Sequence, residues 1–307
     1  LPKAYDAAML VMSTFLSPKG RVRILWRMLG FFGITLFIAT ATAAALNSTG
    51  VIGGSLGLLA GSVVAGWVLL SLDGRKPAAL GFYLTKDSLP ESFHGLVFGS
   101  LISMMVVGTM AMFGGITWVT EDGTVTAWIV GAGSALAWFA IPAAAEEALL
   151  RGYPLQALTE AYGPEVSVVT TAVAFGALHL WNPGVGVLEI VNVTVAGLLF
   201  GIVYVKTLSL WCVTAMHLGW NWVLGYAADV SVSGLDLIDA PLYEGSTSGG
   251  EWLGGGNFGP EGSVVATAVL LGATVWTLRS VRLVPNAAAL RAGSLVASLS
   301  ETDKSGD

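Results

Sequence analysis

The sequence predicts an all-α fold, a polytopic integral membrane bundle of about eight transmembrane helices. Of the 307 residues, 54% are hydrophobic and only 11% are charged, whereas an ordinary soluble domain has about 25% charged residues. Several apolar runs reach the length of about 20 residues that a helix needs to cross a bilayer. The Lys and Arg residues fall between these runs on one side only, which is typical of membrane proteins.

Eight runs account for the predicted helices, and polar or Gly- and Pro-containing segments separate them. They are residues 27–46, 51–72, 93–116, 128–150, 164–180, 187–205, 210–228 and 263–282. The fourth run is expected to continue as a helix to a turn at Gly163 and Pro164, with a kink near Pro154. The linker 229–262 before the last run is rich in Gly and Ser, so we expect a flexible outer loop.

These helices form one predicted domain, residues 27–283, between two segments on the cytoplasmic side. The N-terminal segment, residues 1–26, is expected to contain an interfacial helix at 4–16, and the tail, residues 284–307, is expected to be disordered. With this orientation all 14 Lys and Arg residues lie inside, and the outer loops carry only acidic residues. The sequence therefore predicts a multi-pass protein of the cell membrane with both termini in the cytoplasm.

Polar side chains inside the predicted spans are the first candidates for function, because burying them in hydrocarbon is costly. The candidates are Glu146, Glu147, Arg151, His179, Glu189, Asn192, His217 and Asn221. Glu147 and Arg151 are four residues apart, so they can pair on one helix face and lower each other's cost. Glu146 is rotated by about 100° from Glu147 and has no such local partner. Glu189 and His94 lie near the ends of their runs, where we expect them to contact water.

A hairpin argument brings four of these residues together. Glu146 lies 17 residues before Gly163 and His179 lies 16 residues after it, so an antiparallel pair of helices places them at the same depth, facing each other. His217 and Asn221 are four residues apart and point the same way from the next hairpin. A carboxylate, two imidazoles and a carboxamide are the parts of a hydrolytic site: a base for water, an assisting His and donors to an oxyanion.

At these residues the sequence resembles a known family. The segments EEALLR (146–151), FGALH (175–179) and HLGWN (217–221) match the ordered motifs EExxxR, FxxxH and HxxxN. These are signatures of the type II CAAX prenyl protease and bacteriocin-processing family, the CPBP or Abi intramembrane proteases. The resemblance covers about residues 70–228, with a motif core at 142–225. It implies an eight-helix membrane peptidase whose active site lies within the bilayer.

The resemblance also implies roles for the motif residues. Glu146 and His179 look like the pair that activates water, and His217 and Asn221 look like oxyanion donors or metal ligands, with Glu147 and Arg151 in support. The family is often described as metalloproteases, and a metal-free glutamate mechanism has also been proposed for it. The sequence lacks HExxH, the spacing that indicates zinc most firmly. We therefore expect no required cofactor, with zinc on Glu146, His179 and His217 as the alternative.

The expected function is an intramembrane endopeptidase that cleaves peptides or membrane-associated proteins with a Glu- and His-activated water. A non-catalytic membrane scaffold or immunity protein of the same fold is the alternative, because a fold does not establish an activity. A transporter is less favoured, since the sequence has no visible repeats of the transporter kind. The expected partners are the lipid bilayer and a peptide or membrane-protein substrate. Nucleic acid is not expected, because the net charge is −6.

Overall fold

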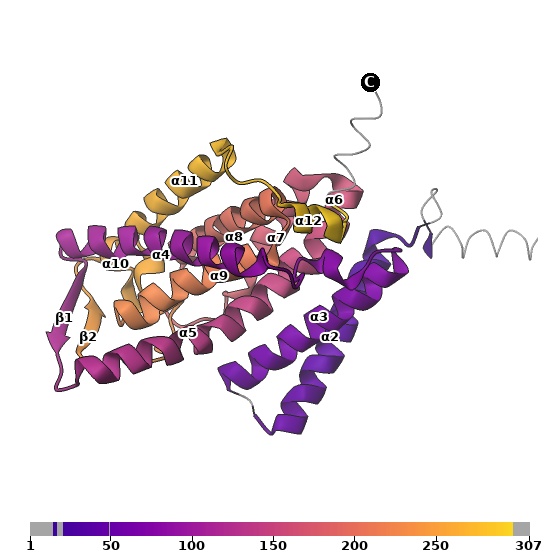
Figure 1. Ribbon diagram of the computed structural model, residues 1–307. Helices are drawn as coiled ribbons and strands as arrows, with labels where there is room; N and C mark the ends of the chain where they lie inside the picture. The colour runs from indigo at the N-terminus through magenta and orange to yellow at the C-terminus, as the bar shows by residue number, and fades with distance from the viewer. Residues whose placement is uncertain (1–14, 17–20, 49, 297–307) are drawn as a thin grey trace, which may run out of the picture.

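The computed structural model describes residues 15–16, 21–48 and 50–296, and Figure 1 shows these as a helical bundle with one small sheet at one end. The interfacial helix predicted at 4–16 lies almost entirely outside the described residues. Eight of the described helices correspond to the eight predicted runs. They are α2 (Ile24–Leu46), α3 (Val51–Leu72), α4 (Ser88–Met112), α5 (Val125–Glu147), α7 (Pro164–Leu178), α8 (Val187–Thr207), α9 (Leu210–Trp222) and α11 (Val264–Arg279).

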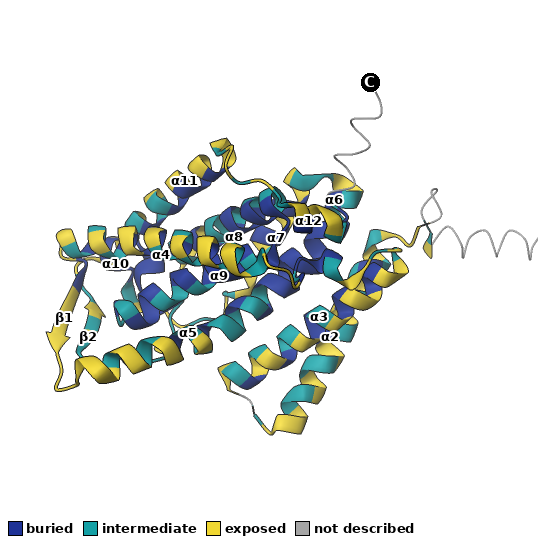
Figure 2. Cartoon of the chain, in the orientation of Figure 1, coloured by how far each residue is buried: buried dark blue, intermediate teal, exposed yellow. Residues whose placement is uncertain are grey.

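Most of these helices have the length and hydropathy of membrane spans. Five segments of the described chain are long and apolar enough to cross a bilayer: α2, α3, α4, α8 and the continuous helix Val125–Tyr162, while α7 and α11 are shorter apolar helices. The prediction of an all-α polytopic bundle is confirmed, and the count of eight crossings stays a prediction. Figure 2 shows buried residues concentrated around α8 and α9, whereas α2 exposes most of its surface.

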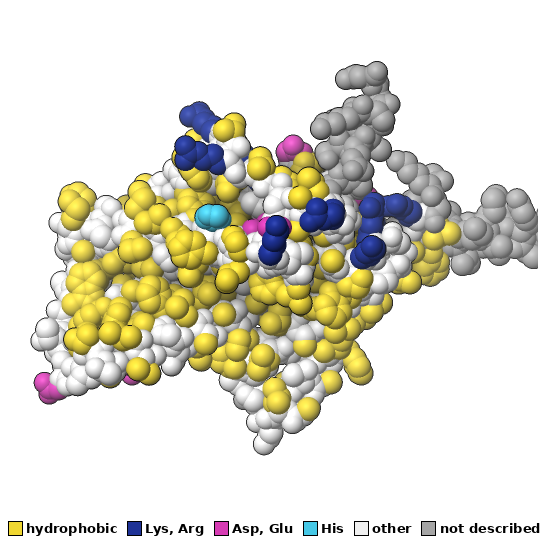
Figure 3. All heavy atoms as spheres, in the orientation of Figure 1, with side chains coloured by type: hydrophobic (Ala, Val, Ile, Leu, Met, Phe, Trp, Pro, Cys, Tyr) yellow, Lys and Arg dark blue, Asp and Glu magenta, His cyan; other side chains and the backbone are white. Residues whose placement is uncertain are grey.

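The two ends of the bundle differ in charge. The end where α2 and α4 begin, here the basic end, carries Arg27, Lys86, Lys206 and Arg279. Figure 3 shows Lys and Arg side chains gathered toward this end. The opposite, acidic end carries the sheet, in which β1 (Ile116–Thr120) pairs antiparallel with β2 (Tyr243–Thr247). The predicted orientation rests on this difference in charge, and the placement of the basic end in the cytoplasm stays a prediction.

Glycines bring the central helix α9 close to α4. A Cβ atom on Gly95 or Gly99 of α4 would collide with the α9 backbone at Cys212 or Met216, and one on Gly219 of α9 would collide with α4. Small residues of this kind let helix backbones approach closely in membranes, where close packing and not water drives association. The central position of α9 fixes where its motif residues lie.

The fourth predicted run continues past α5 as expected. A π-helical turn, Ala148–Gly152, follows α5 and leads into α6 (Tyr153–Tyr162). Gly163 then turns the chain into α7 with a φ of 87°, in the left-handed region that glycine adopts without strain. The predicted turn is confirmed, and the irregularity in the helix is the π turn just before Pro154 rather than a simple proline kink.

Helix α6 anchors the α2–α3 hairpin at the basic end. Arg27 of α2 donates to the hydroxyl of Tyr153 (2.7 Å), to Glu160 (2.7 Å) and to Asp73 at the end of α3 (2.7 Å), and Tyr153 in turn donates to Asp73 (2.8 Å). Arg27 is buried, and the carboxylates of Asp73 and Glu160 compensate its charge. The hairpin is therefore held at one end, and α3 packs on α5 and on the π turn.

The linker 229–262 is ordered, so the predicted flexible loop is wrong. It contains β2, the short helix α10 (Glu251–Gly254) and two turns of 3-10 helix, Gly256–Phe258 and Pro260–Gly262. Composition misleads here because the linker buries apolar side chains such as Phe258, which is fully buried, and pairs a strand with β1. Residue 116, the predicted end of the third span, lies in β1 and not in a helix.

The start of the C-terminal segment also packs on the bundle, so the prediction of a disordered tail from residue 284 is wrong for 284–296. Helix α12 (Ala287–Ala292) begins at Asn286, whose side chain accepts from the Ala289 amide (2.8 Å). Ala288 and Ala289 are buried against Tyr83 and Leu208. Residues 297–307 lie outside the described part of the chain.

Candidate active site

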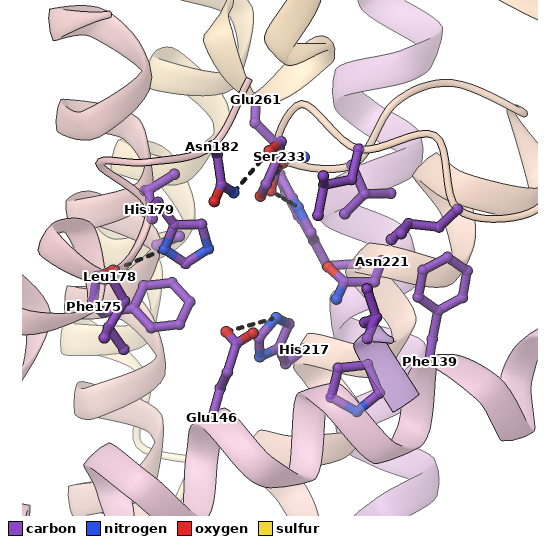
Figure 4. Close-up of a pocket in the computed structure, with 18 of the residues that line it drawn as sticks. Phe139, Glu146, Phe175, Leu178, His179, Asn182, His217, Asn221, Ser233 and Glu261 are labelled. Atoms are coloured by element: carbon purple, nitrogen blue, oxygen red, sulfur yellow. Dashed lines mark hydrogen bonds and ion pairs between the residues drawn. The ribbon is translucent and has the colours of Figure 1, made fainter. Parts of the chain in front are cut away.

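The four residues predicted to be catalytic line one cavity of about 340 Å³. Its walls come from α3, α5, α7, α8 and α9, and the linker 229–262 covers it at the acidic end. Figure 4 shows Glu146 at the end of α5, His179 at the end of α7, and His217 and Asn221 on α9 around this space. Three helices that are separate in sequence thus bring the motif residues together, as the hairpin argument predicted.

Glu147 is the central buried acceptor beside the cavity. Arg151 Nη1 donates to Glu147 Oε1 at 3.1 Å, and neither side chain is exposed. The predicted pair is therefore confirmed. The same Oε1 lies 2.9 Å from His217 Nδ1, a contact that the sequence did not reveal. Arg151 Nη2 also donates to Gly197 O at 2.9 Å, and the guanidinium stacks on the ring of Phe175, 4.6 Å from its centroid.

Glu146 points into the cavity instead. Its Oε2 lies 4.0 Å from His217 Nε2, so the two glutamates face the two nitrogens of one imidazole. This oxygen is buried and accepts no hydrogen bond from any described residue. Glu146 and His179 share the cavity, as predicted, but no hydrogen bond joins their side chains in the described part of the chain. A small molecule between them is needed to connect the two groups.

His179 follows the last residue of α7. Its Nδ1 lies 2.8 Å from Phe175 O, a carbonyl that only accepts, so this nitrogen carries a proton. Figure 4 shows the other ring nitrogen on the cavity side, where a neutral imidazole is an acceptor. The Phe175 ring contacts both imidazoles, with centroids 4.9 Å from His179 and 5.8 Å from His217. The aromatic residue of the FxxxH motif therefore fixes the distance between the two His side chains.

Asn221 lies one helical turn beyond His217 on the same face of α9, as its spacing predicted. Its side chain is half-buried, makes no hydrogen bond with the described residues and points into the cavity (Figure 4). The neighbouring Trp220 donates its indole N–H to Glu261 Oε1 at 2.8 Å. The carboxamide of Asn221 is thus available to a molecule in the cavity.

The sequence missed the residues that cover the cavity. Glu261 is buried and accepts from Trp220 and, through Oε2, from the amide (2.5 Å) and hydroxyl (2.7 Å) of Ser233. Asn182, which follows α7, donates to Ser233 O at 2.8 Å (Figure 4). The signal that was available is the indole of Trp220, because a buried indole N–H needs an acceptor.

Two other membrane candidates lie outside the cavity. Asn192 is buried on α8 and donates to Glu261 O (2.7 Å) and Ser263 O (2.9 Å), while it accepts from Thr267. It joins α8 to the linker and α11 and has a structural role. Glu189 is partly exposed in the first turn of α8 and does not line the cavity.

The alternative metal ligands share the cavity without forming a ligand set. No group of three or more His, Cys, Asp or Glu side chains among the described residues is placed to hold one metal ion. Each imidazole offers only its Nε2, because the Nδ1 of His217 contacts Glu147 and that of His179 contacts Phe175. As placed, Glu146, His179 and His217 line one cavity but do not form such a group.

Comparison with known proteins finds a family model that matches most of the motif core. A family model described as type II CAAX prenyl endopeptidase Rce1-like matches residues 128–223. No curated protein and no solved structure gives a significant match to the chain. The matched segment extends from α5 to the end of α9 and contains all four cavity residues together with Glu147 and Arg151. The match of residues 128–223 to the Rce1-like, type II CAAX prenyl endopeptidase model confirms the resemblance to the CPBP proteases predicted from the three motifs.

Proposed function

We propose that this protein is an intramembrane endopeptidase that hydrolyses peptide bonds of membrane-associated proteins or peptides. One observation carries the proposal. Glu146, His179, His217 and Asn221, from three different helices, line a single cavity in which the Glu146 carboxylate has an unpartnered oxygen. An unpaired carboxylate beside two imidazoles inside a membrane bundle is costly, and such groups are retained where they are used.

Glu146 is the proposed general base. A water molecule between Glu146 and His179 gives one proton to the carboxylate as its oxygen attacks the scissile carbonyl. His179 Nε2 accepts the second hydrogen of that water and orients it, since its Nδ1 proton is held by Phe175 O. The protonated Glu146 then transfers its proton to the departing amine, which returns the carboxylate to its starting form.

His217 and Asn221 are the proposed donors to the oxyanion. The Asn221 amide contributes one N–H. His217 contributes Nε2–H when both ring nitrogens are protonated, while its Nδ1–H donates to Glu147. In that form the charges of Glu146, Glu147, Arg151 and His217 sum to zero, which is the favourable balance for a buried cluster. No step of this mechanism requires a metal ion, and we propose that none is required for activity.

The surroundings of the cavity support a substrate held in or at the membrane. Most lining side chains are apolar, and they include Val51 and Leu58 of α3, the helix whose outer face is exposed. Val51 itself is 44% exposed, so the wall of the cavity reaches the exposed surface of α3. An apolar segment or a lipid anchor of a substrate can therefore lie against α3 while the scissile bond reaches Glu146.

Cleavage by the purified protein in liposomes tests the proposal. Peptides that end in a prenylated CAAX motif, the same peptides without the prenyl group, and apolar transmembrane peptides are compared with wild-type protein. Glu146→Gln is the inactive form, and Glu189→Gln is its matched control, because Glu189 lies on a membrane helix outside the cavity. We expect cleavage by the wild type and the control only. Cleavage by Glu146→Gln at the wild-type rate would refute the proposal. The non-catalytic scaffold would be favoured if no substrate were cleaved and if the wild type and Glu146→Gln both retained a bound partner.

A further inference from the structure

A groove separate from the active-site cavity lies between α4 and α11. A cavity of about 690 Å³ at the basic end is bounded by α4, α8, α9, Trp276 of α11 and residues 282–286. A further cavity of about 450 Å³ lies between α4 and α11. Phe98 and Trp276, whose ring centroids are 5.1 Å apart, line both cavities. The two cavities therefore lie end to end along α4 and α11, and together they are called the α4–α11 groove.

The groove is polar at the basic end and apolar deeper in the bundle, as a phospholipid is polar at its headgroup and apolar along its acyl chains. The part at the basic end is lined by polar and apolar side chains, the polar ones being Asp87, Glu91, His94, Thr207, Arg282 and Asn286. The part deeper in the bundle has no charged side chain in its lining, which includes Ile102, Met105 and Val269. Figure 3 shows this face, with hydrophobic side chains along α4 and α11 and a His among them near the Lys and Arg residues.

The polar groups at the basic end fall into two sets. Glu91 is satisfied, because it accepts from the Tyr83 hydroxyl, from Ser209 Oγ at 2.7 Å and from Asn286 Nδ2. The bond from Asn286 holds this residue against α4, and the three bonds together fix the Glu91 side chain in the wall of the groove. The side chains of Asp87, His94 and Arg282, in contrast, make no hydrogen bond or ion pair with the described residues, although all three line the groove. They offer one carboxylate, one imidazole and one guanidinium to a ligand.

We propose that the α4–α11 groove binds one molecule of phosphatidylethanolamine. Arg282 and His94 contact its phosphate, Asp87 accepts from its primary ammonium group, and an acyl chain lies along Phe98, Met105 and Val269. The charges of the free side chains complement a zwitterion that carries both a phosphate and an N–H donor. Phosphatidylglycerol has no cation for Asp87, and the choline group of phosphatidylcholine has no N–H to donate, so both bind less tightly.

Gly272 provides a test of the apolar half of the groove. It lines the groove on α11, and a Cβ atom at this position would meet no atom within 4 Å. Gly272→Leu therefore fills the space without disturbing helix packing. Gly33→Leu on α2 is the matched control, because Gly33 is also exposed on a helix with no atom within 4 Å of an added Cβ. Native mass spectrometry of protein extracted from membranes that contain phosphatidylethanolamine and phosphatidylglycerol measures the retained lipid.

We expect the wild type and Gly33→Leu to retain one phosphatidylethanolamine, and Gly272→Leu to lose it while its melting temperature without lipid stays unchanged. Equal retention by Gly272→Leu would overturn the proposal. A farnesylated peptide that occupies the groove in place of any phospholipid, and is excluded by Gly272→Leu, would also overturn it and assign the groove to a substrate.

Asp87→Asn tests the recognition of the headgroup. Delipidated wild-type protein is titrated with the three phospholipids, and the rise in melting temperature reports binding. We expect phosphatidylethanolamine to bind about two- to fivefold more tightly than the other two, as a partly exposed ion pair allows. Asp87→Asn should remove this preference while the binding of phosphatidylcholine stays the same. Equal binding of all three lipids by the wild type would mean that the groove holds only a nonspecific boundary lipid.

Discussion

The Nδ1 atom of His217 lies 2.9 Å from Oε1 of Glu147, while its Nε2 faces Glu146 at 4.0 Å. Glu147 therefore orients the imidazole ring that Glu146 faces. This relationship gives the two adjacent carboxylates different roles. Glu147 connects Arg151 to His217 and is completely buried, whereas Glu146 opens onto the cavity.

The first prediction separates these two glutamates. Glu146→Gln keeps the shape of the side chain and removes the base, so we expect turnover to fall by about 10²–10⁴ with an unchanged melting temperature. Glu147→Gln leaves Arg151 without its buried counterion, so we expect a loss of about 3–5 kcal/mol in the free energy of unfolding. Cleavage rates and thermal melting of both variants measure this. A folded, inactive Glu147→Gln beside an active Glu146→Gln would reverse the assignment.

A double variant tests how Glu147 contributes to activity. Arg151→Leu alone leaves the buried Glu147 carboxylate with His217 as its remaining donor and without its guanidinium counterion, so it should lower the yield of folded protein. Glu147→Leu combined with Arg151→Leu removes both charges, so we expect melting to recover toward that of the wild type. Activity should stay low in the double variant, since His217 loses its acceptor. Full activity in a stable double variant would show that the Glu147–His217 contact is not needed.

The third prediction concerns the cover of the cavity. Glu261 joins Trp220 to Ser233, so Glu261→Ala should loosen residues 232–237 and speed their amide hydrogen exchange. Glu251→Ala is the control, because Glu251 is exposed on α10 in the same linker. We expect a rise in exchange only for Glu261→Ala. Identical exchange in the two variants would mean that Glu261 does not hold the cover in place.

The fourth prediction uses Asp229, which follows the last turn of the helix that carries His217. Burial raises the pKa of this carboxyl above its ordinary value of 3.8, despite hydrogen bonds from the amides of Ala240 and Gly245. A raised pKa means that its stabilising effect is complete below the ordinary pKa and is lost as the pH rises through the raised value. Asn adopts the positive φ of this position and does not ionise. Asp229→Asn should therefore melt like the wild type in acid and at a higher temperature than the wild type at neutral pH. A difference that shrinks as the pH rises would contradict this.

The fifth prediction concerns metals. We expect cleavage to continue after dialysis against a strong chelator, and purified active protein to hold zinc well below one equivalent. Metal analysis and activity are measured on the same sample. Activity that disappears with the metal and returns when zinc is restored would refute the metal-free proposal.

The local features of the fold and site could be predicted from the sequence, whereas most long-range contacts could not. The pairing of Glu147 with Arg151 and the shared face of His217 and Asn221 follow from helical spacing alone. The placement of Glu146 near His179 needed only the turn at Gly163. The contact between Glu147 and His217 joins residues 70 positions apart, and no periodicity indicates it.

The linker 229–262 shows why composition alone does not predict whether a segment is ordered. Its Gly and Ser content is that of a flexible segment, yet Phe258 and Glu261 are buried because the rest of the bundle supplies their partners. Residues 284–296 behave in the same way, since Asn286 binds Glu91 on α4. Composition indicates how a segment behaves by itself, whereas in these two segments tertiary contacts with the bundle decide that the chain is ordered.

The π-helical turn Ala148–Gly152 separates two parts of one long helix that must face different neighbours. Before it, Glu146 and Glu147 are aimed at α9, and after it Tyr153 is aimed at Arg27 and Asp73. One residue of an α-helix corresponds to about 100° of rotation. A single-residue deletion inside this turn would therefore rotate the whole of α6 and detach the α2–α3 hairpin, although every residue of the three motifs outside the deletion kept its identity. In this helix the number of residues is as strict a requirement as their chemistry.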